Sequence, residues 1–66
     1  MATTKIIELI GASPNSWEDA AQNGLVKAGE TVKEIKSVDC VAFTAKVENN
    51  KIVEYRTNMK VAFVVE

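Results

Sequence analysis

The residues best suited to bind a ligand lie on one side of two predicted strands in the second half of the chain. In residues 51–66, polar and apolar side chains alternate, and every second residue from Ile52 falls on the wetter side. Residues 34–48 read as a second strand that adds side chains to the same side. The predicted small-molecule or anion site comprises Ser37, Phe43, Arg56 and Asn58. Copies of Arg56 would meet there near a symmetry axis, and Phe43 would offer a ring face.

Two other interpretations of this polar side stay open. A row of alternating charges is also typical of a solvated surface, or of a subunit interface whose rim ion pairs contribute about 0–1 kcal/mol each. Alternatively, Asp39, Glu8 and Glu54 would supply oxygen ligands for Ca²⁺ or Mg²⁺ where copies of the chain converge.

The composition argues against several other functions. The chain has no His, one Cys, no G-x-S-x-G motif and no phosphate-binding loop, so we expect no enzyme. Eight basic and nine acidic residues nearly cancel, which does not suit a nucleic-acid partner. The first eleven residues are too short for a signal-peptide core or a membrane span. We therefore expect a soluble, cytoplasmic protein without a membrane partner.

The pattern around Asn49 and Asn50 predicts a long β-hairpin, because this pair tolerates the positive φ angles of a two-residue turn. The resulting register pairs Asp39 with Lys60 and Cys40 with Met59. It also pairs Phe43 with Arg56 and Val41 with Asn58, and it places Val38, Cys40, Ala42 and Thr44 on the same side as Tyr55, Thr57, Met59, Val61 and Phe63. Cys40 is then a small core residue.

The first half of the chain predicts one strand and one helix. Residues 4–11 are largely apolar on both faces, as in a strand covered on both sides. Ser13 is expected to cap a helix that starts at Pro14, and Gly29 to mark the helix end. An apolar stripe with a small middle, suited to close packing on a sheet, comprises Trp17, Ala20, Ala21, Gly24, Ala28, Val32 and Ile35. Trp17 is read as a core anchor or subunit contact rather than a ligand platform.

These elements predict one α+β domain over residues 1–66, with β-α-β-β order and a three-stranded antiparallel sheet wrapped around one helix. A chain of 66 residues buries a small core, and a single Cys without His supplies neither a disulfide nor a structural zinc site. Of the usual ways to stabilise a small domain, which are disulfides, a bound metal and self-association, self-association remains.

The chain resembles the dodecin family in three segments: KIIELIGASPNSWEDA, AGETVKEIKSVDCV and YRTNMKVAFVVE. The resemblance covers nearly the whole sequence. It implies a hollow homododecamer of β-α-β-β subunits, and many members of the family hold flavins between their subunits. It further implies a protein that binds or stores small molecules or ions.

The resemblance also implies weak or absent flavin binding. Flavin-binding dodecins carry a Trp that stacks on the isoalloxazine ring and a Gln that hydrogen-bonds it. Those positions align with Ser37, which has no ring, and Arg56, which has donors but no acceptor. This pattern is more similar to a flavin-poor branch that includes a calcium dodecin. The alternative is a purely structural oligomer with calcium or magnesium at subunit interfaces.

Overall fold

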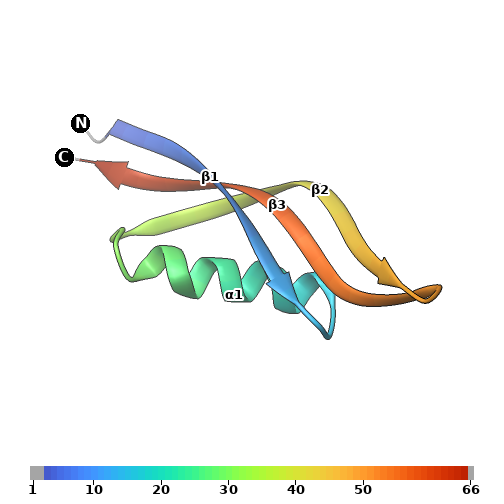
Figure 1. Ribbon diagram of the computed structural model, residues 1–66. Helices are drawn as coiled ribbons and strands as arrows, with labels where there is room; N and C mark the ends of the chain where they lie inside the picture. The colour runs from blue at the N-terminus through green and yellow to red at the C-terminus, as the bar shows by residue number, and fades with distance from the viewer. Residues whose placement is uncertain (1–2, 66) are drawn as a thin grey trace.

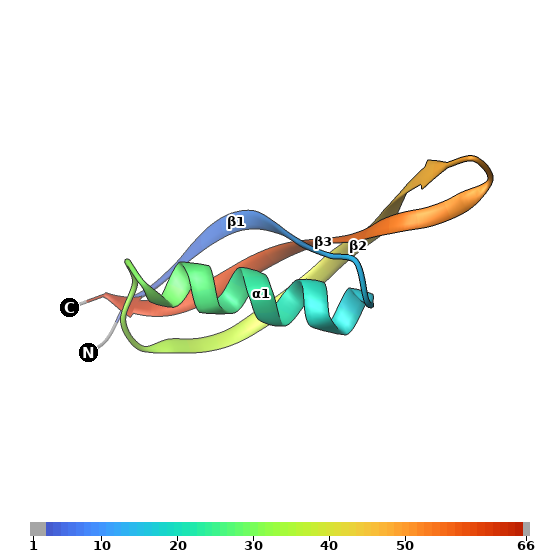
Figure 2. The ribbon, with the colours of Figure 1, turned by 60° about the horizontal axis from the view of Figure 1, so that its bottom comes forward.

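The computed structural model describes residues 3–65, and the elements follow the order β-α-β-β (Figure 1). Strand β1 spans Thr3–Ser13, helix α1 spans Trp17–Gly29, strand β2 spans Ile35–Glu48 and strand β3 spans Lys51–Val65. The strands form one antiparallel sheet in the order β1-β3-β2, and α1 lies along one face of it (Figure 2). This confirms the predicted fold class; Glu66, which we expected in the last strand, lies outside the described residues.

The hairpin between β2 and β3 has the predicted two-residue turn. Asn49 and Asn50 have φ angles of 53° and 62°, so both adopt the left-handed conformation that suits such a turn. Asp39 is directly opposite Lys60, and Cys40 is opposite Met59. Both of these predicted pairs are confirmed.

The register between these two pairs and the turn differs from the prediction. Val53 on β3 and Val41 on β2 have no direct partner, and each shifts the pairing by one residue. Between the two irregularities, Phe43 pairs with Thr57 instead of Arg56, and Ala42 rather than Val41 pairs with Asn58. Because one residue of shift exchanges the faces, Phe43 moves to the helix side of the sheet, and Ala42 and Thr44 move to the opposite side.

Helix α1 begins three residues later than predicted, at Trp17. Its cap is Ser16, whose Oγ accepts a hydrogen bond of 3.0 Å from the backbone N–H of Asp19. Ser13 instead ends β1, where its buried hydroxyl donates to Asp19 Oδ2 at 2.6 Å and accepts from the N–H of Asn15 at 2.9 Å. The first of the two serines therefore fixes the turn, and the second starts the helix.

The far end of α1 is at Gly29, as predicted, so Val32 and Ile35 lie beyond the helix. The small residues of the stripe face the sheet: Ala20, Gly24 and Ala28 are the buried residues of α1. They pack where the sheet presents Met59, Val61 and Thr57, which are at most 1% exposed. Thr57 Oγ1 also donates a 2.9 Å hydrogen bond to the Trp17 carbonyl, which ties the helix start to β3.

The helix and sheet approach each other most closely at two glycines. A Cβ atom on Gly11 would meet the carbonyl group of Ala20 and lie 3.2 Å from the backbone N of Gly24. A Cβ on Gly24 would meet the side chains of Met59 and Leu9. The small stripe thus brings the helix axis close to the sheet, as the sequence indicated.

We predict that Gly11→Ala destabilises the protein by about 1–3 kcal/mol, because the new methyl group meets helix backbone that cannot rotate away. Urea unfolding followed by circular dichroism measures this. Gly29→Ala is the matched control, because no atom lies within 4 Å of its added Cβ. Equal stability of the two variants would contradict the close approach.

Candidate functional site

The face of the sheet opposite α1 carries the polar residues singled out from the sequence. On β3 they alternate with the buried residues Thr57, Met59 and Val61. Three rows cross the sheet from β1 through β3 to β2: Glu8–Lys60–Asp39, Ile10–Asn58–Ala42 and Ala12–Arg56–Thr44. This open face, defined by these rows, is the candidate site.

Charged groups on the open face are arranged around two cations. Lys60 on β3 lies in register between Glu8 on β1 and Asp39 on β2, so a basic residue separates two acidic residues across the sheet. Arg56 is held by Glu54: its Nε donates a 2.8 Å hydrogen bond to Glu54 Oε2, and its Nη2 forms an ion pair with the same oxygen at 2.8 Å. The Arg56–Glu54 pair is partly exposed and adds little stability, but it orients the guanidinium along the strand.

The structure divides the predicted small-molecule site between two faces. Arg56 and Asn58 are neighbours on the open face, and Ser37 joins that face farther along β2, opposite Ala62. Phe43 lies on the helix side, where its ring meets Trp17. Within one chain, Phe43 therefore does not contact a ligand bound at Arg56.

The predicted metal ligands are also only partly together. Glu8 and Asp39 share a row, whereas Glu54 lies farther along β3 beside Arg56. Among residues 3–65, no three acidic or cysteine side chains lie close enough together to hold a metal ion.

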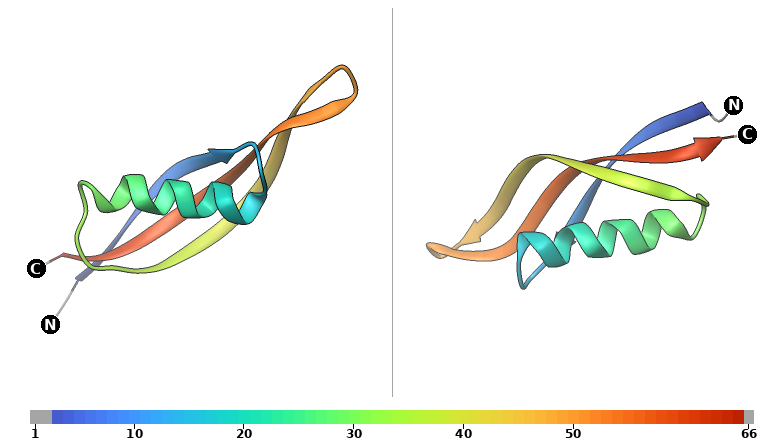
Figure 3. Two further views of the ribbon diagram at one scale, coloured as in Figure 1. Left: turned by 90° about the horizontal axis from the view of Figure 1, so that it is seen from below. Right: turned by 180° about the vertical axis from the view of Figure 1, so that it is seen from behind.

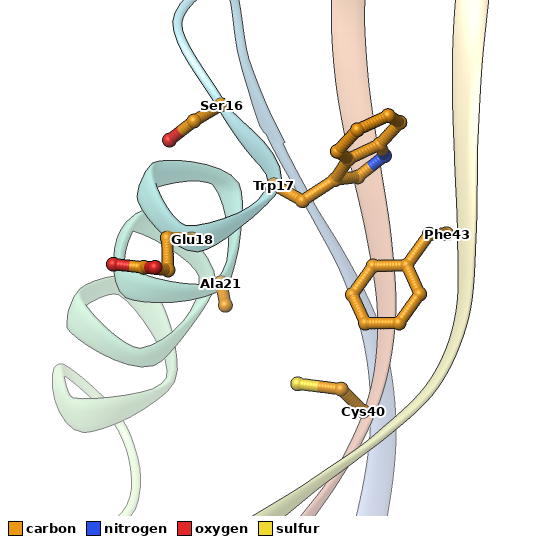
Figure 4. Close-up of a pocket in the computed structure, with 6 residues that line it drawn as sticks. All are labelled: Ser16, Trp17, Glu18, Ala21, Cys40 and Phe43. Atoms are coloured by element: carbon orange, nitrogen blue, oxygen red, sulfur yellow. The ribbon is translucent and has the colours of Figure 1, made fainter.

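A second feature, which the sequence did not reveal, is a cleft of about 460 Å³ between the start of α1 and β2. Figure 4 shows its lining residues: Ser16, Trp17, Glu18, Ala21, Cys40 and Phe43. We call it the Trp17 cleft. No sequence pattern indicated this cleft, because only the shifted register places Phe43 beside Trp17.

Aromatic contacts shape the Trp17 cleft. The Trp17 ring packs edge-on against Tyr55 at 4.7 Å and against Phe43 at 6.3 Å between centroids. Its indole N–H donates a 2.9 Å hydrogen bond to the Thr44 carbonyl. Cys40 is exposed here, so the prediction of a core cysteine is wrong for the single chain: one helix does not extend over this part of β2.

Comparison with known proteins agrees with this arrangement. The family model of dodecin matches residues 3–66. The chain belongs to the dodecin family. Dodecins are known as non-enzymatic binding proteins whose members self-assemble.

One curated dodecin, calcium dodecin from Mycobacterium tuberculosis, is 32% identical over 63 residues, which cover 96% of this chain and 89% of that protein. The solved structure of the calcium-chelating calcium dodecin from the same organism has a TM-score of 0.85 at 30% identity. The superposition covers 97% of this chain and 91% of the calcium dodecin chain.

The fold is shared with more distant dodecins. Dodecin from Streptomyces davaonensis superposes with a TM-score of 0.95 at 23% identity, covering 98% of this chain and 96% of that one. The tt0972 protein from Thermus thermophilus gives a TM-score of 0.95 at 24% identity, and the superposition covers 100% of this chain and 97% of that one. Within residues 3–65, the helix is too short and too polar to cross a membrane.

We predict that Trp17→Phe lowers the free energy of unfolding by about 0.5–1.5 kcal/mol, because Phe keeps a ring against Tyr55 but lacks the N–H that bonds Thr44. Urea unfolding followed by circular dichroism measures the change. Tyr55→Phe, which retains both the ring contact and the Trp17 hydrogen bond, should unfold like the native chain. Native stability of Trp17→Phe would show that the N–H bond is energetically neutral.

Proposed function

We propose that this chain is the subunit of a homododecameric particle that binds and stores small molecules or ions, with weak or no flavin binding. The single observation that supports assembly most is the amount of apolar side chain that one chain leaves uncovered. The large apolar residues exposed by 39–61% are Ile6, Ile10, Val26, Val41, Phe43, Val47, Ile52, Val53 and Val65. By contrast, the buried apolar core of the described residues comprises Ala20, Ala28, Met59 and Val61.

The dimensions of the chain support the same proposal. Its radius of gyration is 13.4 Å, whereas a compact domain of this length has about 11 Å. Its accessible surface is 4862 Å², whereas a compact monomer of this mass exposes about 4,100 Å². Additional copies would remove this excess apolar surface from water, at a gain of about 25 cal/mol per Å².

We predict that the purified protein has a mass in solution of twelve chains, about 86 kDa from 7.2 kDa each. Light scattering coupled to size exclusion measures it. A monomer at micromolar concentration, unchanged on dilution, would refute the assembly.

The flavin part of the proposal depends on Ser37 and Arg56. Both lie on the open face, Ser37 opposite Ala62 and Arg56 opposite Thr44. Ser37 offers no ring for stacking, which is worth about 0.5–1.5 kcal/mol beyond area burial for each aromatic pair. Arg56 cannot accept a hydrogen bond, and its Nε already donates one to Glu54.

We predict that the native protein quenches riboflavin fluorescence weakly and that the double variant Ser37→Trp, Arg56→Gln quenches it strongly. The variant restores a stacking ring and a group that both donates and accepts. A fluorescence titration measures both affinities. Tight quenching by the native protein would contradict weak flavin binding, and no quenching by the variant would indicate an interface used for assembly alone.

A second candidate function is calcium or magnesium binding at subunit interfaces. The Glu8–Lys60–Asp39 row supports it, because this row places two exposed acidic residues on the open face, where a second chain could add oxygen ligands. The relative named calcium dodecin, 32% identical, supports the same choice of ion.

We predict that the combined variant Glu8→Gln, Asp39→Asn lowers calcium affinity at least tenfold, because it removes two of the anionic ligands. Equilibrium dialysis against radioactive calcium measures this. Glu48→Gln is the control, since Glu48 pairs with Lys46 at the hairpin end. If the native assembled protein binds no calcium, or the two variants lose equal affinity, the row is not the site.

A further inference from the structure

Arg56, the only arginine in the chain, lies on the open face between short, uncharged neighbours. In its row it is flanked by Ala12 on β1 and Thr44 on β2, and its own side chain is 47% exposed. Figure 3 shows α1 on one face of the sheet, and no other element of residues 3–65 covers the opposite face. A guanidinium in such a place is suited to bind a phosphate or a carboxylate, because its planar fork matches their oxygens.

Glu54 already occupies one edge of this guanidinium. Nε of Arg56 donates a 2.8 Å hydrogen bond to Glu54 Oε2, and Nη2 lies 2.8 Å from the same oxygen. The two residues are two positions apart on β3, so their side chains lie on the same face of the sheet. A carboxylate of the chain itself therefore takes the place on this edge that an anionic ligand would take.

The nearest other cation does not draw Glu54 away from Arg56. Lys46 is directly opposite Glu54 on β2, but its ammonium forms an ion pair with Glu48 at 3.5 Å. Within residues 3–65, Arg56 is the only ion-pair partner of Glu54. The negative charge of Glu54 therefore stays at the guanidinium.

The rest of the open face adds no positive surplus. Its second cation, Lys60, lies in register between Glu8 and Asp39. The three rows together with Glu54 thus hold two basic residues, Arg56 and Lys60, against three acidic ones, Glu8, Asp39 and Glu54. An approaching anion meets no net attraction from these residues.

We propose that Glu54 determines the ligand specificity of the open face. By filling one edge of Arg56 and balancing its charge, Glu54 discriminates against phosphate and carboxylate ligands, and it leaves uncharged or cationic small molecules as the preferred class. An anion at the remaining edge of the guanidinium would lie close to the Glu54 carboxylate and be repelled by it. This inference rests on the proposed small-molecule function and adds the class of ligand that the face selects.

The test measures the binding of inorganic phosphate at Arg56 by NMR. Labelling arginine with a nitrogen isotope gives one Nε–Hε signal for the chain, because Arg56 is its only arginine. At low salt, where charge interactions are least screened, Glu54→Gln should bind phosphate about fivefold more tightly than the native protein, which is the effect of one well-formed exposed ion pair.

Glu30→Gln is the matched control. It also removes one negative charge and one exposed ion pair, with Lys27, but it lies at the end of α1 rather than on the open face. Its phosphate affinity at Arg56 should equal that of the native protein. An equal gain in Glu30→Gln would show that net charge alone is responsible and would overturn the role of Glu54.

Two further results would overturn the specificity role. They are equal phosphate affinity of Glu54→Gln and the native protein, and no phosphate binding at Arg56 in either. In both cases the mass in solution and the binding of other small molecules are unaffected, so the proposed function would stand. A monomeric mass would instead remove the assembly and leave the role of Glu54, because Glu54 and Arg56 belong to the same chain.

The same NMR signal gives a second measurement that needs no ligand. In the native protein, the Hε resonance should lie at higher frequency than in Glu54→Gln, because a hydrogen bond to a carboxylate is shorter and stronger than one to a neutral amide. Glu30→Gln should leave the resonance in its native position. Identical Hε positions in Glu54→Gln and the native protein would show that Glu54 does not hold Arg56 in solution.

Discussion

One helix covers a sheet more than twice its length, and this mismatch determines the rest of the structure. Helix α1 has 13 residues and is about 20 Å long, whereas the 15 residues of β3 reach about 50 Å. The longest dimension of the chain, 52 Å, matches the strand rather than the helix. The core is therefore confined to the strip where Gly11 and Gly24 allow close approach, and apolar surface beyond it stays exposed.

The uncovered surface has two distinct chemistries, which suit different roles. The open face carries paired and alternating charges, with Lys60 between Glu8 and Asp39 and Arg56 held by Glu54. The Trp17 cleft carries aromatic side chains, and the end of the β2–β3 hairpin, residues 46–54, carries exposed aliphatic ones. We infer that the apolar surfaces serve assembly and that the charged face is left for ions or small polar ligands.

Much of this fold follows from sequence patterns whose physical basis is local. Alternation along residues 51–66 identified the buried face of β3, and Asn49 and Asn50 identified the turn, because few residue pairs tolerate its φ angles. The prediction that Ser13 caps the helix is wrong, because Ser13 and Ser16 are equally good cap residues by type. Only the fold decides between them: Ser13 is the partner of Tyr55 in the sheet.

The candidate site was harder to predict than the fold. The predicted register near Asp39 is correct. The one-residue shifts at Val53 and Val41 cancel, so the pairs on either side of the two bulges, Glu48–Lys51 and Asp39–Lys60, keep the predicted register. Ordinary valines in a valine-rich strand carry no signal for a bulge, so the side chosen for Phe43 was wrong. In the proposed assembly, Glu8, Asp39 and Arg56 meet a ligand only together with neighbouring chains, whose positions no pattern within one sequence specifies.

The central claim is that this chain is stable because other copies cover its exposed surface. The most direct test is the thermal midpoint as a function of protein concentration, followed by circular dichroism from nanomolar to high micromolar chain. Coupled folding and assembly predicts a midpoint that rises steadily with concentration, because mass action favours the assembled state. A midpoint that stays constant over this range, with fully reversible unfolding, would contradict the account.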